Sequence, residues 1–190
     1  MKLLALDPGN TRTAYVVYDT HSKRLVEHGQ NRNPEIVAQL VALRDQPGGP
    51  VHLACEMVGC YGQIAGRTLF ETCFWIGRFV EAWHVGFNLV LRRGRWGPGP
   101  EVTGAAGEYD GVTMCLCGST RAKDKNVRQA LIDRFPPTGG GKTPQIGTKA
   151  KPGALYGVST DTWAALAVAI TFAEAMRLAR AKEDELCPFA

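Results

Sequence analysis

The sequence predicts a mixed α/β fold, with a mixed central sheet of about five strands flanked by helices, in one domain spanning residues 1–190. Three observations lead to this prediction. Short β-branched and aromatic runs separated by turn residues open the chain, which favours strands joined by tight connections. Strands then alternate with segments whose apolar residues recur at helical spacing. Parallel strands need a crossover between them, so this order favours a mixed sheet covered by helices.

The first half of the chain supplies the sheet. Its first two strands are joined by the segment 7–10 (DPGN), which is typical of a turn because proline fixes its own φ and glycine and asparagine tolerate positive φ. A helix is expected at 34–44, since a proline begins it and a proline- and glycine-rich stretch follows it. A longer helix at 63–85 carries one apolar stripe, formed by Leu69, Cys73, Ile76, Val80 and Trp83. The predicted strands are 2–6, 13–18, 24–28, 51–55 and 88–91.

The second half of the chain is richer in loops. Residues 94–111 are rich in glycine and proline and have no period, so we expect an exposed loop or insertion there. Residues 114–117 (MCLC) resemble a short strand. The segment 139–143 (GGGKT) resembles a phosphate-binding loop, but Pro136 stands where that motif needs a glycine, so 138–153 is predicted to be a flexible basic loop. Helices are expected at 124–135 and 160–181.

Composition and charge restrict the kind of protein only broadly. The 22 Lys and Arg against 18 Asp and Glu indicate an anionic partner weakly. Six cysteines without CxxC spacing predict reduced thiols in an intracellular protein. The first apolar run stops at Asp7, too early for a signal peptide, and charges within 63–85 argue against a membrane span there. We therefore expect a cytoplasmic protein with no membrane partner.

Three acidic residues fall at positions where side chains converge. Asp7 ends the first strand, Glu56 ends the strand after the first helix, and Asp161 opens the last long helix. Strand ends and helix starts meet at one edge of an α/β sheet, where three carboxylates repel one another unless a cation lies between them. Mg²⁺ suits such a site because it prefers oxygen ligands. Singly, each acid has a plainer explanation: a turn start, a solvated strand end, or a carboxylate that complements a helix dipole.

The segments around these acids resemble the motifs of the RuvC-type Holliday junction resolvases. LALDPGNTRTAYVVYD resembles their opening motif, in which an apolar strand, Asp-Pro-Gly and a polar loop precede a second strand. LACEMV resembles the second motif, a strand that delivers a glutamate, and STDTWAALAVAITFAEA resembles the last, an acidic helix start. CLCGSTRAKDKNVRQALIDRF and KPGALYGVSTD resemble segments of phage-encoded members. The resemblance covers nearly the whole chain except Arg95 to Asp110.

This resemblance implies an RNase H-like fold, Mg²⁺ or in its place Mn²⁺, with one or two ions per active site, and cleavage of branched DNA by a homodimer. The residues that match its catalytic and metal-binding positions are Asp7, Glu56 and Asp161. The chain departs from the pattern at Ala164, where the family has a second acidic residue three positions after the first, which leaves the number of ions open. Just after the glutamate, the family has an aromatic residue that stacks at the junction centre. In this chain Gly59 stands near that position, so Tyr61 is the predicted substitute. A phage-encoded member would work in the host cytoplasm.

Basic residues gather in the second half of the chain and its loops. Phosphate contacts need mobile cations and close backbone approach, which glycine-rich loops provide. The clusters at 121–128 and 142–151 are therefore predicted to contact DNA, although any one lysine is more simply a solvated surface charge; Arg92 belongs to the same group of cations. The predicted DNA-binding residues are Tyr61, Arg67, Arg93, Arg121, Lys123, Lys125, Arg128, Lys142, Lys149 and Lys151.

The leading hypothesis is a metal-dependent, structure-selective endonuclease that resolves four-way or other branched DNA junctions by phosphodiester hydrolysis. Two symmetric cuts favour a two-fold dimer, for which the helix at 63–85 offers Phe70, Phe74 and Trp83. Two alternatives stay open. A non-catalytic branched-DNA-binding module would explain Ala164. An actin-like or sugar-kinase-like ATPase shares the opening strand, Asp, Gly-loop and strand, but needs two such domains in a longer chain.

Overall fold

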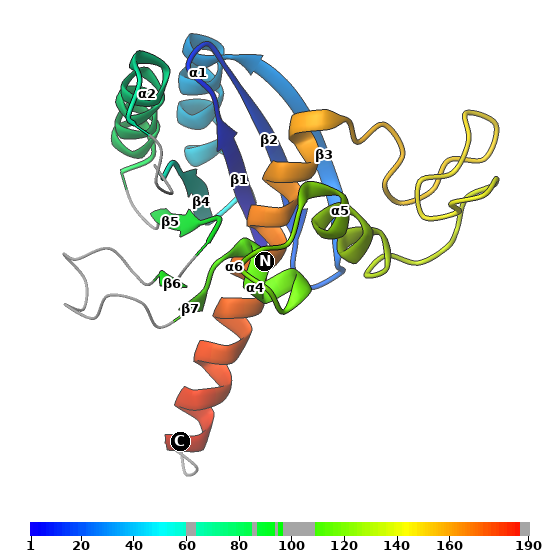
Figure 1. Ribbon diagram of the computed structural model, residues 1–190. Coiled ribbons are helices and arrows are strands. Elements are labelled where there is room, and N and C mark those ends of the chain that lie inside the picture. The colour runs from blue at the N-terminus through cyan, green and yellow to red at the C-terminus, as the bar shows by residue number, and fades with distance from the viewer. Residues whose placement is uncertain (60–63, 85–86, 94, 97–108, 187–190) are drawn as a thin grey trace.

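A five-stranded mixed sheet with the strand order β3-β2-β1-β4-β5 forms the centre of the molecule (Figure 1). The structure is a computed structural model that describes residues 1–190 except 60–63, 85–86, 94, 97–108 and 187–190. Helices cover both faces of the sheet (Figure 1). The predicted mixed α/β class is confirmed.

The strands follow the predicted order. β1 (Lys2–Pro8), β2 (Arg12–Asp19) and β3 (Arg24–Arg32) form the antiparallel meander expected at the N-terminus. β4 (His52–Met57) pairs in parallel with β1, and β5 (Phe87–Leu91) pairs in parallel with β4. β3 runs past its predicted end at residue 28. As an edge strand it leaves most side chains in solvent, so its second half lacks the apolar alternation that marks a strand.

The two faces of the sheet carry separate cores, because successive side chains of a strand point to opposite faces. On one face, Leu4 and Leu6 pack among residues of α1 (Asn33–Arg44) and α2 (Arg67–Trp83). On the other, Leu3 and Ala5 pack against α6 (Thr160–Leu186). The short helices α4 (Val112–Cys117) and α5 (Asp124–Ile132) contribute to this second core. The face that α6 covers is the one that matters for the site below.

The buried stripe of α2 differs from the predicted one. Thr72, Ile76, Phe79 and Trp83 are buried, so the helix faces the sheet with Phe79 rather than Val80. Trp83 is only 2% exposed and belongs to the core, so its predicted part in a dimer interface is wrong. Apolar residues at helical spacing predict that one side of a helix is buried, but they do not determine how the helix is rotated about its own axis against the sheet.

The segment 114–117 is helical, so the predicted strand there is wrong. It lies in α4, which begins after Gly111 and ends at Gly118 in the left-handed conformation. A four-residue apolar run does not distinguish a buried strand from a buried helical turn, and here the glycines at both ends decide. Within the predicted insertion 94–111, β6 (Arg95–Trp96) pairs with β7 (Tyr109–Asp110); residues 97–108 lie outside the described part of the chain.

Residues 137–154 form a projection from the body that we call the arm (Figure 1). Backbone hydrogen bonds connect the segments of the arm to one another. They include Gly139 N–H to Pro144 O (2.7 Å) and Gly140 N–H to Lys151 O (2.9 Å). A Cβ on Gly139 would lie 2.6 Å from Gly147 Cα, so only glycine permits this close approach. The segment has neither a helix nor a named strand, as the prediction of a loop requires, and its backbone is internally hydrogen-bonded. Its flexibility stays a prediction.

α6 is long and apolar enough, by length and composition alone, to cross a membrane over Thr160–Ala181. In the structure 61% of that window is buried, and Leu166, Ala167 and Val168 pack in the core against the sheet. This is the burial expected of a core helix.

Candidate active site

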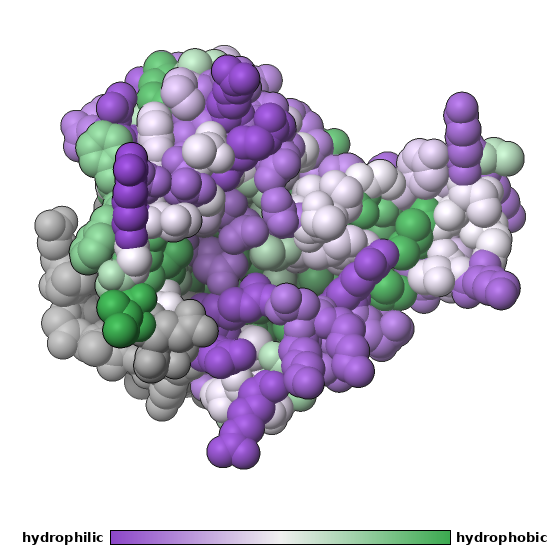
Figure 2. Space-filling view, turned by 45° about the horizontal axis from the view of Figure 1, so that its top comes forward, coloured by the Kyte–Doolittle hydropathy of each residue, from purple (hydrophilic) through white to green (hydrophobic). Residues whose placement is uncertain are grey.

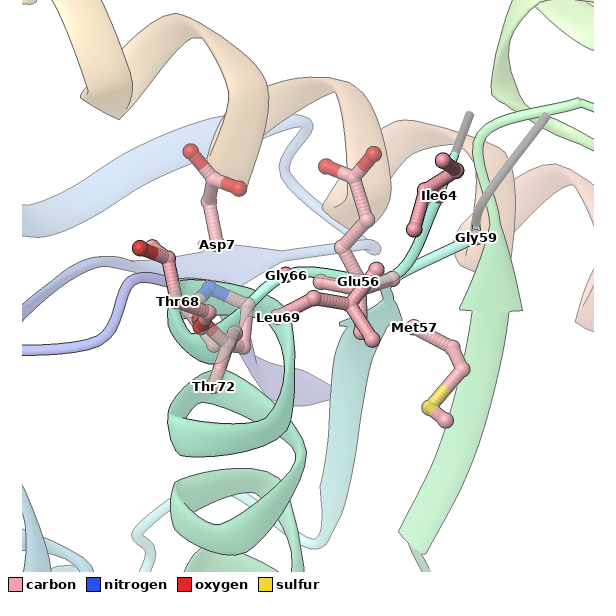
Figure 3. A pocket seen from close by; sticks show the side chains of 11 residues that line it. Asp7, Glu56, Met57, Gly59, Ile64, Gly66, Thr68, Leu69 and Thr72 are labelled. Atoms are coloured by element: carbon pink, nitrogen blue, oxygen red, sulfur yellow. The ribbon is translucent and has the colours of Figure 1, made fainter. Parts of the chain in front are cut away.

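Asp7 and Glu56 lie level with each other at the ends of two neighbouring strands. Leu6 on β1 is in register with Cys55 on the parallel strand β4, so the residues that follow them, Asp7 and Glu56, are neighbours. Because side chains alternate, both carboxylates point to the face of Ala5, which α6 covers. Figure 3 shows the two carboxylates pointing to the same side of the sheet.

The turn after Asp7 is stabilised by hydrogen bonds within the turn and from Asn33. Gly9 N–H donates to Arg12 O at 3.0 Å, and a Cβ on Gly9 would lie 2.5 Å from that oxygen. The buried Asn33 at the start of α1 donates from Nδ2 to Gly9 O and accepts from Thr13 Oγ1. These contacts hold the backbone that carries Asp7 in place, as a preorganised site requires.

Burial raises the pKa values of both carboxyl groups. The pKa of Asp7 is raised to about 8, first by burial, then by the charge of Glu56 and a side-chain hydrogen bond with it, and then by the charge of Asp161. Burial likewise raises the pKa of Glu56, and the guanidinium of Arg92 opposes this rise. The negative charges of Glu56 and Asp161 both act on Asp7, and they add to the effect of its burial.

Asp161 approaches the pair from α6. It is the second residue of the helix and exposed, and its Oδ2 accepts a hydrogen bond of 2.6 Å from Gln30 Nε2 on β3. Gln30 is in register with Ala14 and Ala14 with Asp7, so one row of the sheet connects the helix start to the strand end. The small Ala14 between them leaves room for the N-terminus of α6.

Arg92, directly after β5, joins the acids to α5. Its guanidinium lies 3.6 Å from Glu56 Oε1 and also pairs with Asp124, the first residue of α5. The Arg92 carbonyl accepts hydrogen bonds from both the backbone N–H and the Oγ1 of Thr113, at 3.0 Å each. Charge pattern alone assigned Arg92 to the DNA-facing surface, and only the structure places it beside Glu56.

A cleft of about 450 Å³ opens beside the two carboxylates. It lies between the ends of β1 and β4 and the first turns of α2, as Figure 3 shows. Residues that line it include Asp7, Glu56, Met57, Thr68, Leu69 and Thr72. The cleft makes the acids accessible to a ligand from outside.

The donor set fits a hard divalent cation. Glu56 Oε2 is buried and has no hydrogen-bond partner among the described residues, and the neighbouring Asp7 supplies a second carboxyl group. Oxygen ligands of this kind suit Mg²⁺ or Mn²⁺. Within the part of the chain that the structure describes, however, no three His, Cys, Asp or Glu side chains stand close enough to hold one ion. The residues brought together are therefore a pair, with Asp161 nearby but bonded to Gln30.

The predicted DNA-binding residues fall into three groups. The cluster 121–128 lies at the start of α5, and the ion pair between Arg92 and Asp124 connects it to the acids. The guanidinium of Arg128 lies 4.8 Å from the ring centre of Trp163. Lys142, Lys149 and Lys151 are exposed on the arm, where hydrophilic side chains project among residues of near-neutral hydropathy (Figure 2). The remaining candidates lie elsewhere: Arg67 pairs with Glu71, Arg93 is exposed after β5, and Tyr61 lies outside the described residues.

Two residues of the site carried no sequence signal of their own. Gln30 lies in an edge strand that the sequence pattern only partly predicts, and Asp124 is one acid in a polar helix start. Their roles arise from pairing with Asp161 and Arg92, which are 131 and 32 residues away along the chain. Contacts over such separations leave no local pattern.

One acid lies at the end of β1, another at the end of β4, and a third at the start of the helix that covers the same face of the sheet. Among solved structures the chain is similar to RuvC of Thermus thermophilus, at 17% identity over 94% of this chain and 97% of that one, with a TM-score of 0.62. It is also similar to T. thermophilus RuvC in complex with a Holliday junction substrate, at 16% identity over 94% and 96%, with a TM-score of 0.57.

These likenesses confirm the predicted RuvC-like, RNase H-like fold. No family model and no curated protein matches the chain. The resemblance to phage-encoded members stays a prediction.

Proposed function

We propose that this protein is a metal-dependent, structure-selective DNA endonuclease that resolves four-way or other branched junctions. The observation that carries the proposal is the pair of buried carboxylates, Asp7 and Glu56, at the open edge of a RuvC-like sheet, with Asp161 at the helix start beside them. The likeness to a RuvC structure with a Holliday junction substrate supports the choice of substrate.

In this proposal Asp7 and Glu56 hold the divalent cation, and Asp161 contributes from α6. Mg²⁺ or Mn²⁺ bound there would supply Lewis-acid stabilisation for hydrolysis of a phosphodiester. Asp7 and Glu56 must both be ionised to bind it, and Gln30 orients Asp161 through its hydrogen bond. The cleft beside the carboxylates admits the scissile strand.

Branched DNA would lie across the cluster 121–128 and the arm. Arg121, Lys123 and Lys125 are exposed beside the acidic site. The arm has three lysines and no Asp or Glu over residues 137–154, and its bonded backbone holds these cations at a distance from the cleft. Cations presented by ordered backbone suit phosphate contacts along a duplex arm.

A homodimer is part of the proposal, since a junction receives two symmetric cuts. Phe70 and Phe74 on α2 are 64% and 59% exposed and line a hollow of about 510 Å³ with Trp75. The guanidinium of Arg78 lies within 6 Å of both the Phe74 and the Trp75 rings, at 5.9 and 5.7 Å. Exposed aromatics gathered beside an arginine are typical of an interface core.

The decisive experiment incubates a synthetic four-way junction with the protein in Mg²⁺ or Mn²⁺. We expect paired, symmetric nicks from the wild type and a loss of about a hundredfold or more in rate from Asp7→Asn, because one carboxylate of the pair is gone. Junction binding, measured by fluorescence anisotropy in Ca²⁺, should be retained. Asp133→Asn, which changes an exposed acid at the C-terminal end of α5, is the matched control and should cleave normally.

A non-catalytic junction-binding module is the second candidate, favoured by Ala164 and by the absence, among the described residues, of three ligating side chains close enough to hold one ion. It predicts tight junction binding with no nicks from the wild type in either metal. Nicks that persist unchanged in Asp7→Asn would instead remove this site from the reaction.

A further inference from the structure

We propose that Arg92 is an internal counter-ion of Glu56 that competes with the divalent cation for this carboxylate, and that Asp124 is the second anchor that retains Arg92 when the cation enters. The inference rests on the proposed metal site, and it assigns Arg92 as a positioning residue that sets the affinity of that site.

The first step of the argument is how the Glu56 carboxylate is shared. Arg92 lies 3.6 Å from Oε1, whereas the buried Oε2 has no partner among the residues described. Glu56 is 8% exposed, so an unpaired charge there is costly, and Arg92 supplies the opposing charge in the metal-free protein. The charge of Arg92 also lowers the pKa of Asp7, so the guanidinium influences both acids.

The second step is repulsion. A divalent cation bound between Asp7 and Glu56 would lie within a few ångströms of the guanidinium, in a partly buried site where charges are poorly screened. The two cations therefore compete for Glu56, and binding of one weakens the contact of the other.

The third step is the second anchor. Asp124 is exposed on α5 and already pairs with the other end of the Arg92 guanidinium. The Arg92 backbone is held at its carbonyl by Thr113, so the exchange needs only a rotation of the side chain toward Asp124. The two partners of Arg92 therefore have opposite effects on the proposed metal site. The ion pair with Glu56 keeps the guanidinium at the site, whereas the ion pair with Asp124 holds it away from Glu56.

The test is isothermal titration calorimetry of Mg²⁺ into the full chain without DNA, at about pH 8.5, above the pKa of about 8 of Asp7. Arg92→Met should bind Mg²⁺ at least about threefold more tightly than the wild type, because the competing charge is removed. Arg92→Lys keeps that charge and should stay close to the wild type. Asp124→Asn should bind about threefold more weakly, because Arg92 is left to Glu56 alone. Asp133→Asn is the matched control, and melting curves check that each variant is folded.

The sign of the change separates this role from a structural one. If Arg92 only braced the site, its removal would loosen the two carboxylates and weaken Mg²⁺ binding, so equal or weaker binding by Arg92→Met overturns the inference. Wild-type affinity in Asp124→Asn overturns the second anchor. Absence of Mg²⁺ binding in both the wild type and Arg92→Met overturns the proposed metal site and this inference together, whereas equal binding by the two overturns the inference alone.

Discussion

At the scale of single residues, the site depends on placing two carboxylates where water and counter-charges are scarce. Asp7 is held by a turn that needs Gly9 for close approach and Asn33 as a brace. Burial, followed by the negative charge of its neighbour Glu56, raises the pKa of Asp7 to about 8. The folded protein therefore carries an electrostatic cost at this edge, which a bound cation would relieve.

This cost predicts how stability depends on pH in the metal-free protein. Because the folded pKa of Asp7 lies above its unfolded value of 3.8, the native state holds a proton that the unfolded state has lost between about pH 4 and pH 8. The free energy of unfolding should fall over that interval, with a slope from Asp7 of at most about 1.4 kcal/mol per pH unit.

Asp7→Asn should flatten this dependence and raise the melting temperature above that of the wild type at about pH 8. Chemical denaturation at several pH values in a chelator measures the effect, with Asp133→Asn as the exposed control. Parallel curves for wild type and Asp7→Asn would contradict the raised pKa.

At the scale of elements, α6 contributes to the core and the arm contributes to the surface. α6 buries alanine-rich turns against the sheet, which lets its N-terminus carry Asp161 close to the strands. The arm makes a different contribution: its glycines pack backbone against backbone, and its lysines face solvent. An element of this kind is preorganised, so little conformational entropy is lost when it binds phosphate.

The arm gives a prediction about salt dependence. The triple variant Lys142→Gln, Lys149→Gln, Lys151→Gln should weaken junction binding and reduce the slope of log Kd against log salt by about two to three, because each lost phosphate contact removes about 0.9 from it. Fluorescence anisotropy in Ca²⁺ across salt concentrations measures this slope. A control triple, Lys23→Gln, Arg177→Gln, Arg180→Gln, removes equal charge from the groove at the Met1 end of β1. An equal fall in slope for both triples would mean that only net charge matters.

At the scale of the whole molecule, the sheet separates two surfaces with different chemistry. The acids, Arg92 and the cluster 121–128 belong to the face of α6, while α2 on the other face exposes Phe70 and Phe74. A two-fold dimer through α2 would leave both sets of acids free to meet DNA.

Phe70→Asp with Phe74→Asp should therefore convert a dimer into a folded monomer, since both side chains are exposed and carry little of the core. Sedimentation velocity measures the mass, and the monomer should give unpaired nicks in place of symmetric ones. Val26→Asp with Leu178→Asp is the control, because these side chains are 54% and 49% exposed elsewhere. A variant that keeps the wild-type mass would place the interface on another surface.

The sequence by itself determined the order of strands and helices and the three acid positions, since turn chemistry and apolar periodicity are local properties of the chain. The predicted strand at MCLC is wrong, because a four-residue apolar run is compatible with both a strand and a helical turn. The sequence also carried no sign of the backbone hydrogen bonds within 138–153.

Only the tertiary structure decided that Asp7 and Glu56 are level, that Gln30 holds Asp161, and that Arg92 lies between Glu56 and Asp124. The physical reason is that strand register and side-chain pairing depend on contacts between residues far apart in sequence, which no short window of the chain contains.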